Sequence, residues 1–175
     1  MLKGQIISNI SNLYQVQVEN RIIECNARGK FKQTEISPVV GDYVEIEILE
    51  NEESKGIICK IMPRKVFIKR PKLANLTQII LVVSLISPKP DFLLLDKQLA
   101  YCEYLKIKPI ICINKIDLGK TEIIYKIHEI YEKIGYMVID TNAKEGIGID
   151  KLKKTLKNEI TAFSGNSGVR EIYFN

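Results

Sequence analysis

Histidine, paired cysteines and long apolar runs are scarce in this sequence, and each shortage narrows the possible functions. His128 is the only histidine, and none of the four cysteines forms a C-x-x-C pair, so the spacing does not fit a zinc site. There is no signal peptide and no run of about eighteen apolar residues, the length that a membrane-spanning helix needs. We therefore expect no metal ligands, no membrane partner, a cytoplasmic location and four reduced thiols in the core. His128 falls in a helical stretch and is interpreted as a surface residue.

Charge is modest overall but unevenly distributed. The chain has 175 residues and a formal net charge of +5, and its length allows one or two domains. Acidic residues are missing between Ser54 and Pro90. The cations of this stretch are Lys55, Lys60, Arg64, Lys65, Lys69, Arg70, Lys72 and Lys89. A stretch that carries only positive charges indicates a polyanionic partner, and nucleic acid is the first candidate. The alternative is an ordinary solvated surface.

The first part of the chain carries β-strand signals. Apolar and polar residues alternate from Tyr43 to Ile48, and Leu13–Val18 and Ile22–Ala27 are short apolar-rich runs. Glycine and asparagine separate these runs. Five short strands in about sixty residues predict a small all-β barrel of the oligonucleotide-binding (OB) type over residues 1–68.

Basic residues around an aromatic side chain fall in a predicted loop of this barrel. Such a loop suits phosphate contact together with base stacking, although barrel loops are often basic for solubility alone. Two further cations follow the barrel. The RNA-binding candidates are Arg28, Lys30, Phe31, Lys32, Arg64 and Lys65.

After Pro63–Lys72, predicted as the connection out of the barrel, the pattern changes to alternating strands and helices. The predicted strands are Gln78–Leu85, Lys108–Ile113, Tyr136–Asp140 and Ile160–Ser164, and the predicted helices are Asp91–Leu105, Thr121–Ile134 and Gly148–Asn158. This alternation predicts an α/β domain with a parallel sheet and right-handed crossovers over residues 69–175.

A polar tetrad, Asn114-Lys115-Ile116-Asp117, directly follows the buried strand Ile110–Ile113. Ligands bind at the carboxyl edge of such sheets. The carboxylate of Asp117 can accept hydrogen bonds from N1–H and the amino group of guanine, which adenine does not match. Asn114 can donate to N7, and the stem of Lys115 can cover the ring. The tetrad predicts a guanine site, with a solvated turn as the alternative.

Two further loops fit this interpretation. Thr141-Asn142-Ala143-Lys144 follows the next predicted strand, and in guanine sites such a loop brings the backbone N–H of the alanine to O6. About fifty residues after the tetrad, Gly165-Asn166-Ser167-Gly168-Val169 begins a phosphate-binding loop of the form G-x-x-x-x-G-K-[S/T]. The sequence therefore predicts base contacts first and phosphate contacts last.

The phosphate loop departs from its pattern at the next three residues. Arg170, Glu171 and Ile172 stand where glycine, lysine and serine or threonine are expected. Glu171 replaces a cation with an anion, and Ile172 removes the hydroxyl that holds Mg²⁺. We expect any GTP binding by this chain to be weak and independent of Mg²⁺.

A barrel, then the Asn-Lys-Ile-Asp tetrad, then Thr-Asn-Ala-Lys, then the phosphate loop resembles the RsgA (YjeQ) family of circularly permuted GTPases. Val40-Gly41-Asp42-Tyr43-Val44, Arg70–Asn75 and Leu95-Asp96-Lys97 strengthen the resemblance, which runs from about Gly4 to Val169. It implies an enzyme that binds GTP or GDP with Mg²⁺, hydrolyses GTP and acts with the small ribosomal subunit and its rRNA. Apart from the resemblance, we expect the chain to be a monomer.

The resemblance also implies parts that these 175 residues do not contain. The family continues with the lysine and serine of the phosphate loop, two switch segments and a zinc domain. We therefore expect a chain truncated inside the phosphate loop, deficient in hydrolysis, with Ile160–Ser164 as an exposed sheet edge. The alternatives are a non-catalytic OB-fold module that binds RNA, or an unstable fragment without function.

Overall fold

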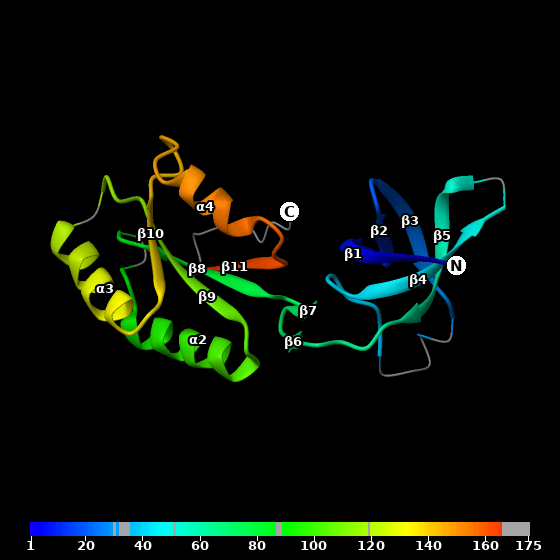
Figure 1. The fold of residues 1–175 in the computed structure, drawn as a ribbon, viewed down its shortest axis with the longest axis horizontal. Helices are drawn as coiled ribbons and strands as arrows, with labels where there is room; N and C mark the ends of the chain where they lie inside the picture. Colours follow the sequence, from blue (N-terminus) through cyan, green and yellow to red (C-terminus); the bar gives the residue numbers. More distant parts are fainter. Residues whose placement is uncertain (30, 32–35, 51, 87–88, 119, 166–175) are drawn as a thin grey trace. The chain divides into compact units, whose positions relative to one another are not determined.

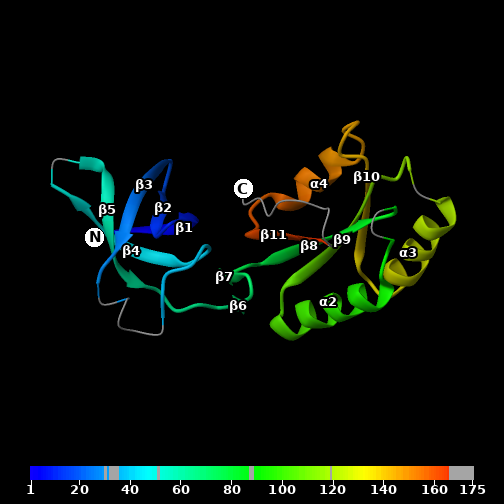
Figure 2. The same cartoon turned by 180° about the vertical axis from the view of Figure 1, so that it is seen from behind.

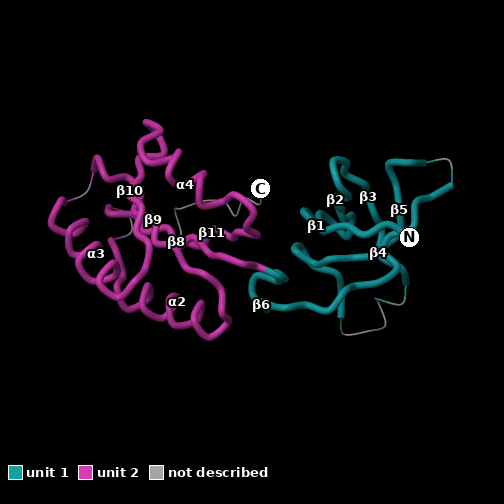
Figure 3. Tube along the Cα trace, viewed as in Figure 1, with its two compact units in different colours: residues 1–75 teal, residues 76–175 magenta. Residues whose placement is uncertain are grey.

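The computed structural model describes residues 1–29, 31, 36–50, 52–86, 89–118 and 120–165. The chain divides into two compact units, residues 1–75 and residues 76–175, coloured separately in Figure 3. Each unit has its own apolar core and is described by itself.

The first unit is a closed five-stranded barrel with strand order β1-β2-β3-β5-β4 (Figure 1). Its strands are β1 (Leu2–Ile10), β2 (Leu13–Val18), β3 (Arg21–Ala27), β4 (Tyr43–Leu49) and β5 (Glu52–Ile61). All pairs are antiparallel except β3 with β5, which is parallel. The predicted OB-like barrel is confirmed.

Alternation along these strands explains why the barrel closes. Side chains at every second position point inward, and the inward set is apolar. The buried core consists of Ile6, Tyr14, Val16, Val18, Ile23, Cys25, Val44, Ile46 and Ile58. The four cysteines of the chain are all free and buried, and burial raises the pKa of each thiol, to about 11 for Cys25 and Cys102.

The segment after the barrel is more ordered than the sequence predicts. The predicted connection contains a two-stranded hairpin, β6 (Phe67–Lys69) with β7 (Lys72–Ala74). Ile68 and Leu73 face each other in this hairpin and are buried. Asn75 joins the hairpin to the barrel, since its Nδ2 donates to the carbonyl of Gly41 at 3.0 Å.

The second unit is a parallel sheet with strand order β10-β9-β8-β11. Its elements are β8 (Gln78–Ser84), α2 (Phe92–Leu105), β9 (Lys108–Asn114), α3 (Thr121–Lys133), β10 (Met137–Thr141), α4 (Ile149–Leu156) and β11 (Thr161–Gly165). The predicted α/β fold is confirmed, and each of its strands and helices begins and ends within two residues of the predicted position. Within the described ranges, no helix is long and apolar enough to cross a membrane.

Helices cover both faces of this sheet. Helices α2 and α3 lie on one face and α4 on the other, as the two opposite views show (Figure 1, Figure 2). On the α4 face, Ile80, Ile110, Cys112 and Ile139 form a core that Leu152, Leu156 and Phe163 extend. Strand β11 lies at the edge of the sheet and pairs with β8. The carboxyl ends of β8, β9 and β10 therefore meet along one edge.

Candidate nucleotide site and basic surface

Three polar residues end adjacent strands at the carboxyl edge of the sheet. Ser84 of β8 is in register with Asn114 of β9, which is in register with Thr141 of β10. Neighbouring positions in register place their side chains on the same face, here the face that α4 covers. Polar groups replace the apolar core at the strand ends, where ligands bind in such folds.

The side-chain amide of Asn114 connects the two loops that the sequence predicts to bind guanine, residues 114–117 and 141–144. Its Oδ1 accepts a hydrogen bond from the backbone N–H of Ala143 at 3.2 Å. The hydroxyl of Thr141 lies 3.2 Å from the same oxygen and 3.1 Å from the carbonyl oxygen of Ile113, so its one proton is shared between these two acceptors. The N–H of Ile116 also donates to the carbonyl of Thr141, at 3.4 Å. The structure therefore brings Asn114, Thr141 and Ala143 together, although about twenty-five residues separate the two loops.

The backbone turns sharply inside the tetrad. Lys115 adopts a φ of +62°, in the left-handed region that only a small fraction of residues other than glycine occupy. Such a conformation persists only where the surroundings hold it, and it is common at binding sites. After this turn, Asp117 is exposed, as is Lys144 in the other loop, while Lys115 is half-buried. The carboxylate of Asp117 is thus open to a ligand.

The second loop closes on itself. Asn142 and Ile147 exchange two backbone hydrogen bonds, of 3.0 and 3.1 Å. Gly148 ends the loop with a φ of +74°, and a Cβ added there would lie 2.0 Å from the carbonyl oxygen of Asp140. Only glycine allows this approach, so the two ends of the loop meet at Asp140.

Two buried polar atoms near the carboxyl ends of the strands have no hydrogen-bond partner among the described residues. They are Nδ2 of Asn142 and Oγ of Ser84. A buried polar group without a partner is destabilising and rare in native proteins. The Oδ1 of Asn142 accepts from the N–H of Glu145 at 3.3 Å, so the donor end of this amide is the unpaired one. Both atoms lie in or beside the candidate site.

His128 contacts Asp140 at the base of this loop, and no pattern in the sequence indicates this contact. Its Nε2 lies 2.9 Å from Oδ1 of Asp140, and its Nδ1 lies 3.0 Å from Oε1 of Glu132. The side chain is 26% exposed, so the surface interpretation holds only in part. No short motif signals this contact, because α3 must first pack on β10.

Of the predicted phosphate loop, only its first residue lies within the described residues. Gly165 ends β11 in register with Val82, while Asn166, Ser167, Gly168 and Val169 lie outside the described residues. In the part of the chain that the structure describes, no cluster of three or more His, Cys, Asp or Glu side chains is placed to hold a metal ion.

Arg64, an RNA-binding candidate, is engaged inside the first unit. Its Nε and Nη2 donate to the two carboxylate oxygens of Asp42 at 2.7 Å, and Nη2 also donates to the carbonyl of Ser37 at 2.8 Å. The guanidinium carbon lies 4.6 Å from the centre of the Phe67 ring. With 17% of its side chain exposed, Arg64 has little surface to offer a nucleic acid.

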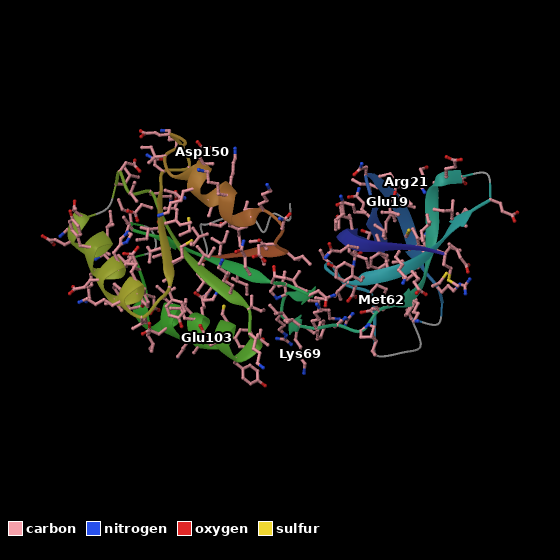
Figure 4. All side chains as sticks on the ribbon, in the orientation of Figure 1. Glu19, Arg21, Met62, Lys69, Glu103 and Asp150 are labelled. Carbon is pink, nitrogen blue, oxygen red and sulfur yellow. The ribbon has the colours of Figure 1, made fainter. Side chains whose placement is uncertain are left out.

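The other RNA-binding candidates occupy different settings. Arg28 forms an exposed ion pair with Glu47, and Phe31 is partly buried and packs against the barrel core. The side chain of Lys65 is exposed, whereas Lys30 and Lys32 lie outside the described residues. More exposed cations gather on the β6–β7 hairpin, where Figure 4 labels Lys69. These cations are Lys69, Arg70 and Lys72.

Comparison with known proteins identifies the family of both units. Residues 3–58 match the RsgA N-terminal domain, and residues 61–170 match the RsgA GTPase. The chain belongs to the RsgA family. This membership confirms the resemblance inferred from the order of barrel, tetrad and phosphate loop.

Relatives in the RsgA family span nearly all of this chain. Proteins named small ribosomal subunit biogenesis GTPase RsgA are 41% identical over 169 residues in Alkaliphilus metalliredigens and 45% identical over 170 residues in Clostridium botulinum. These alignments cover 97% and 96% of this chain but 58% of each relative. The chain thus spans little more than half the length of these relatives.

Two solved structures show the same fold as this chain. YloQ, described as a circularly permuted GTPase, superposes with a TM-score of 0.81, and YjeQ from Thermotoga maritima with 0.82; each is 34% identical to this chain. The matches cover 97% and 96% of this chain and 61% of each neighbour. The description of YloQ agrees with the motif order found here, the tetrad before the phosphate loop.

Proposed function

We propose that this chain binds guanine nucleotides at the carboxyl edge of β9 and β10, as part of the GTPase machinery of the RsgA family. The observation that carries the proposal is the pair of hydrogen bonds from Thr141 and Ala143 to the amide oxygen of Asn114. They bring the two loops together beside the exposed carboxylate of Asp117. Two loops held in this way can close on one planar base.

Each residue of the site has a distinct role in this proposal. Asp117 accepts from N1–H and the amino group of guanine, and the stem of Lys115 covers one face of the ring. The N–H of Ala143 reaches O6, and its bond to Asn114, at 3.2 Å, is long enough to be shared. Asn142 and Lys144 flank Ala143 in the second loop and belong to the proposed guanine site. Adenine presents an acceptor at N1 and a donor in place of O6, so it fits neither loop.

Hydrolysis of GTP depends on residues that contact the phosphates and Mg²⁺, which differ from those that recognise the base. The residues Arg170, Glu171 and Ile172 lack the lysine and hydroxyl that phosphate loops direct at the β- and γ-phosphates and at Mg²⁺. We therefore propose that these 175 residues recognise guanine with modest affinity, that Mg²⁺ adds little, and that hydrolysis by this chain alone is very slow.

Nucleotide titration tests this proposal. Isothermal titration of the chain with GDP, ADP and GTP, each with and without Mg²⁺, separates base recognition from phosphate recognition. We expect GDP to bind at least tenfold more tightly than ADP, because an adenine base leaves Asp117 without donors. Equal affinity for GDP and ADP would show that the two loops do not read the base. A tight, Mg²⁺-dependent isotherm for GTP would contradict the proposed phosphate defect.

A second proposed activity rests on the exposed cations of the first unit. Lys65, Lys69, Arg70 and Lys72 lie on or beside the β6–β7 hairpin and are exposed. We propose that this basic hairpin and the barrel contact RNA of the small ribosomal subunit, with the chain acting as a cytoplasmic monomer. Phosphate contacts make affinity fall steeply with salt, whereas guanine binding depends little on it. Absence of RNA binding at low salt would exclude this role.

A further inference from the structure

A histidine outside the predicted site contacts Asp140, the residue on which the proposed guanine loop (residues 141–148) closes. Both ring nitrogens of His128 face carboxylates, Asp140 at 2.9 Å and Glu132 at 3.0 Å. Because an ionised carboxylate only accepts hydrogen bonds, both nitrogens must carry a proton to satisfy both contacts. The arrangement therefore favours a positively charged ring between two negative groups.

Asp140 is well placed to transmit this contact. It precedes Thr141, whose hydroxyl donates to Asn114, and its own carbonyl oxygen packs against Gly148 at the far end of the loop. The side chain of Asp140 points to α3, whereas that of Thr141, one residue on, lies on the opposite face of the sheet. One residue thus links α3 to both ends of the loop that carries Ala143.

We propose that His128 is a positioning residue for the guanine loop, and that loss of its proton loosens the loop and weakens guanine binding. The part that concerns binding rests on the proposed function. The part that concerns loop order rests only on the contacts of Asp140, and it is tested without a nucleotide.

The surroundings of the ring fix the direction of the effect. Burial opposes the charged ring, but the hydrogen bonds and charges of Asp140 and Glu132 outweigh it and raise the pKa of His128 above its ordinary value of 6.5. Tyr131, one turn along α3, is turned toward Asp96 of α2 and donates to it at 2.8 Å. On α3, Glu129 pairs with Lys133. Among the described residues, Asp140 and Glu132 are the charged groups that act on the ring, and both favour its charged form.

Nuclear magnetic resonance of the ligand-free chain tests the loop directly. The amide shifts of Thr141, Asn142 and Ala143 are followed between about pH 6 and pH 9, the range in which a raised histidine pKa titrates. We expect these amides to titrate together with the His128 ring, at a midpoint above 6.5. In His128→Gln the titration disappears, and in Glu132→Gln the midpoint moves to lower pH because one carboxylate no longer favours the charged ring.

Affinity for GDP supplies the second readout. We expect it to fall roughly threefold to tenfold as the pH rises through the midpoint, the equivalent of about one hydrogen bond, and to stay flat at the lower value in His128→Gln. The matched control is Glu129→Gln, which removes a carboxylate from the exposed face of the same helix and leaves both curves unchanged.

The possible outcomes separate the two proposals. Loop amides that ignore pH, or that titrate alike in wild type and His128→Gln, overturn the positioning role whether or not nucleotide binds. Equal GDP affinity of wild type and His128→Gln at pH 6 also overturns it, while leaving the proposed function intact. Loop titration without any GDP binding supports the positioning role and removes the proposed function.

Discussion

The guanidinium of Arg64 holds the fully buried carboxylate of Asp42 through two hydrogen bonds of 2.7 Å. The same carboxylate accepts from the N–H of Val39 at 2.8 Å, so both of its oxygens are engaged. This contact joins the start of β4 to the chain that leaves the barrel. The cation beside it in the sequence, Lys65, is exposed. Two neighbouring basic residues therefore differ in burial and in their contacts.

Replacing Arg64 should destabilise the barrel. Arg64→Ala leaves the carboxylate of Asp42 buried without its cation, which costs about 3–5 kcal/mol in comparable pairs. Urea unfolding of the full chain measures the loss. Lys65→Ala is the matched control and should lie within about 0.5 kcal/mol of wild type. If Arg64→Ala is as stable as Lys65→Ala, the ion pair does not support the fold.

Replacing the exposed cations of the β6–β7 hairpin should weaken RNA binding and leave the stability of the fold unchanged. Lys69→Ala and Lys72→Ala each remove one phosphate contact, so each should lower the slope of log affinity against log salt by about 0.7 for single-stranded RNA. Melting temperatures should not change, because both side chains are exposed. Lys151→Ala, an exposed cation on α4, is the control. Slopes equal to wild type in both hairpin variants would remove the hairpin from the RNA interface.

Substitutions at two glycines of the proposed guanine loop distinguish the cost of backbone strain from the cost of a steric clash. Gly146 and Gly148 have similar φ values, +77° and +74°, but only at Gly148 would a Cβ meet other atoms, 2.0 Å from the carbonyl of Asp140. Gly146→Ala should therefore cost about 1–2 kcal/mol of stability from strain alone, and Gly148→Ala on the order of 3 kcal/mol or more. Thermal unfolding measures both. Equal effects of the two substitutions would mean that the loop does not close on Asp140.

The free energy of unfolding should decrease as the pH rises through the pKa of His128. Its pKa is raised in the folded chain, so the stabilisation is complete below the unfolded value of 6.5 and is lost as the pH rises through the folded value. Unfolding free energies of wild type and His128→Gln, measured at intervals across this range, should converge at high pH. Parallel curves for the two proteins would show that His128 has the same pKa in both states.

Patterns local to the sequence predict most of the fold. The run Ile110–Ile113 is buried on both sides, as a central parallel strand requires, and its continuous apolar character reveals it. Asp91 predicts the start of α2, where its side chain accepts from the N–H of Leu94. Alternation of apolar and polar residues predicts β4, and short apolar-rich runs between glycine and asparagine residues predict β2 and β3.

The remaining features depend on contacts between residues far apart in the sequence. Arg64 and Asp42 are 22 positions apart, and nothing near Arg64 indicates a buried partner. The contact of His128 with Asp140 needs α3 to pack on β10, and periodicity does not specify which polar residues then meet. Phe31 lies among basic residues, which suggested a surface role, but it packs against the barrel core. Motif chemistry predicted which residues could form the site, and tertiary packing determines how they are held.

The most direct test of guanine recognition is a change of nucleotide preference at Asp117. Xanthine has a carbonyl oxygen where guanine has its amino group, so an amide at position 117 can donate to xanthine but cannot accept both guanine donors. Wild type should bind GDP more tightly than xanthosine diphosphate, and Asp117→Asn should reverse this order, each by about tenfold or more. If Asp117→Asn keeps the preference for GDP, or wild type shows none, Asp117 does not read the base and the proposed function is wrong.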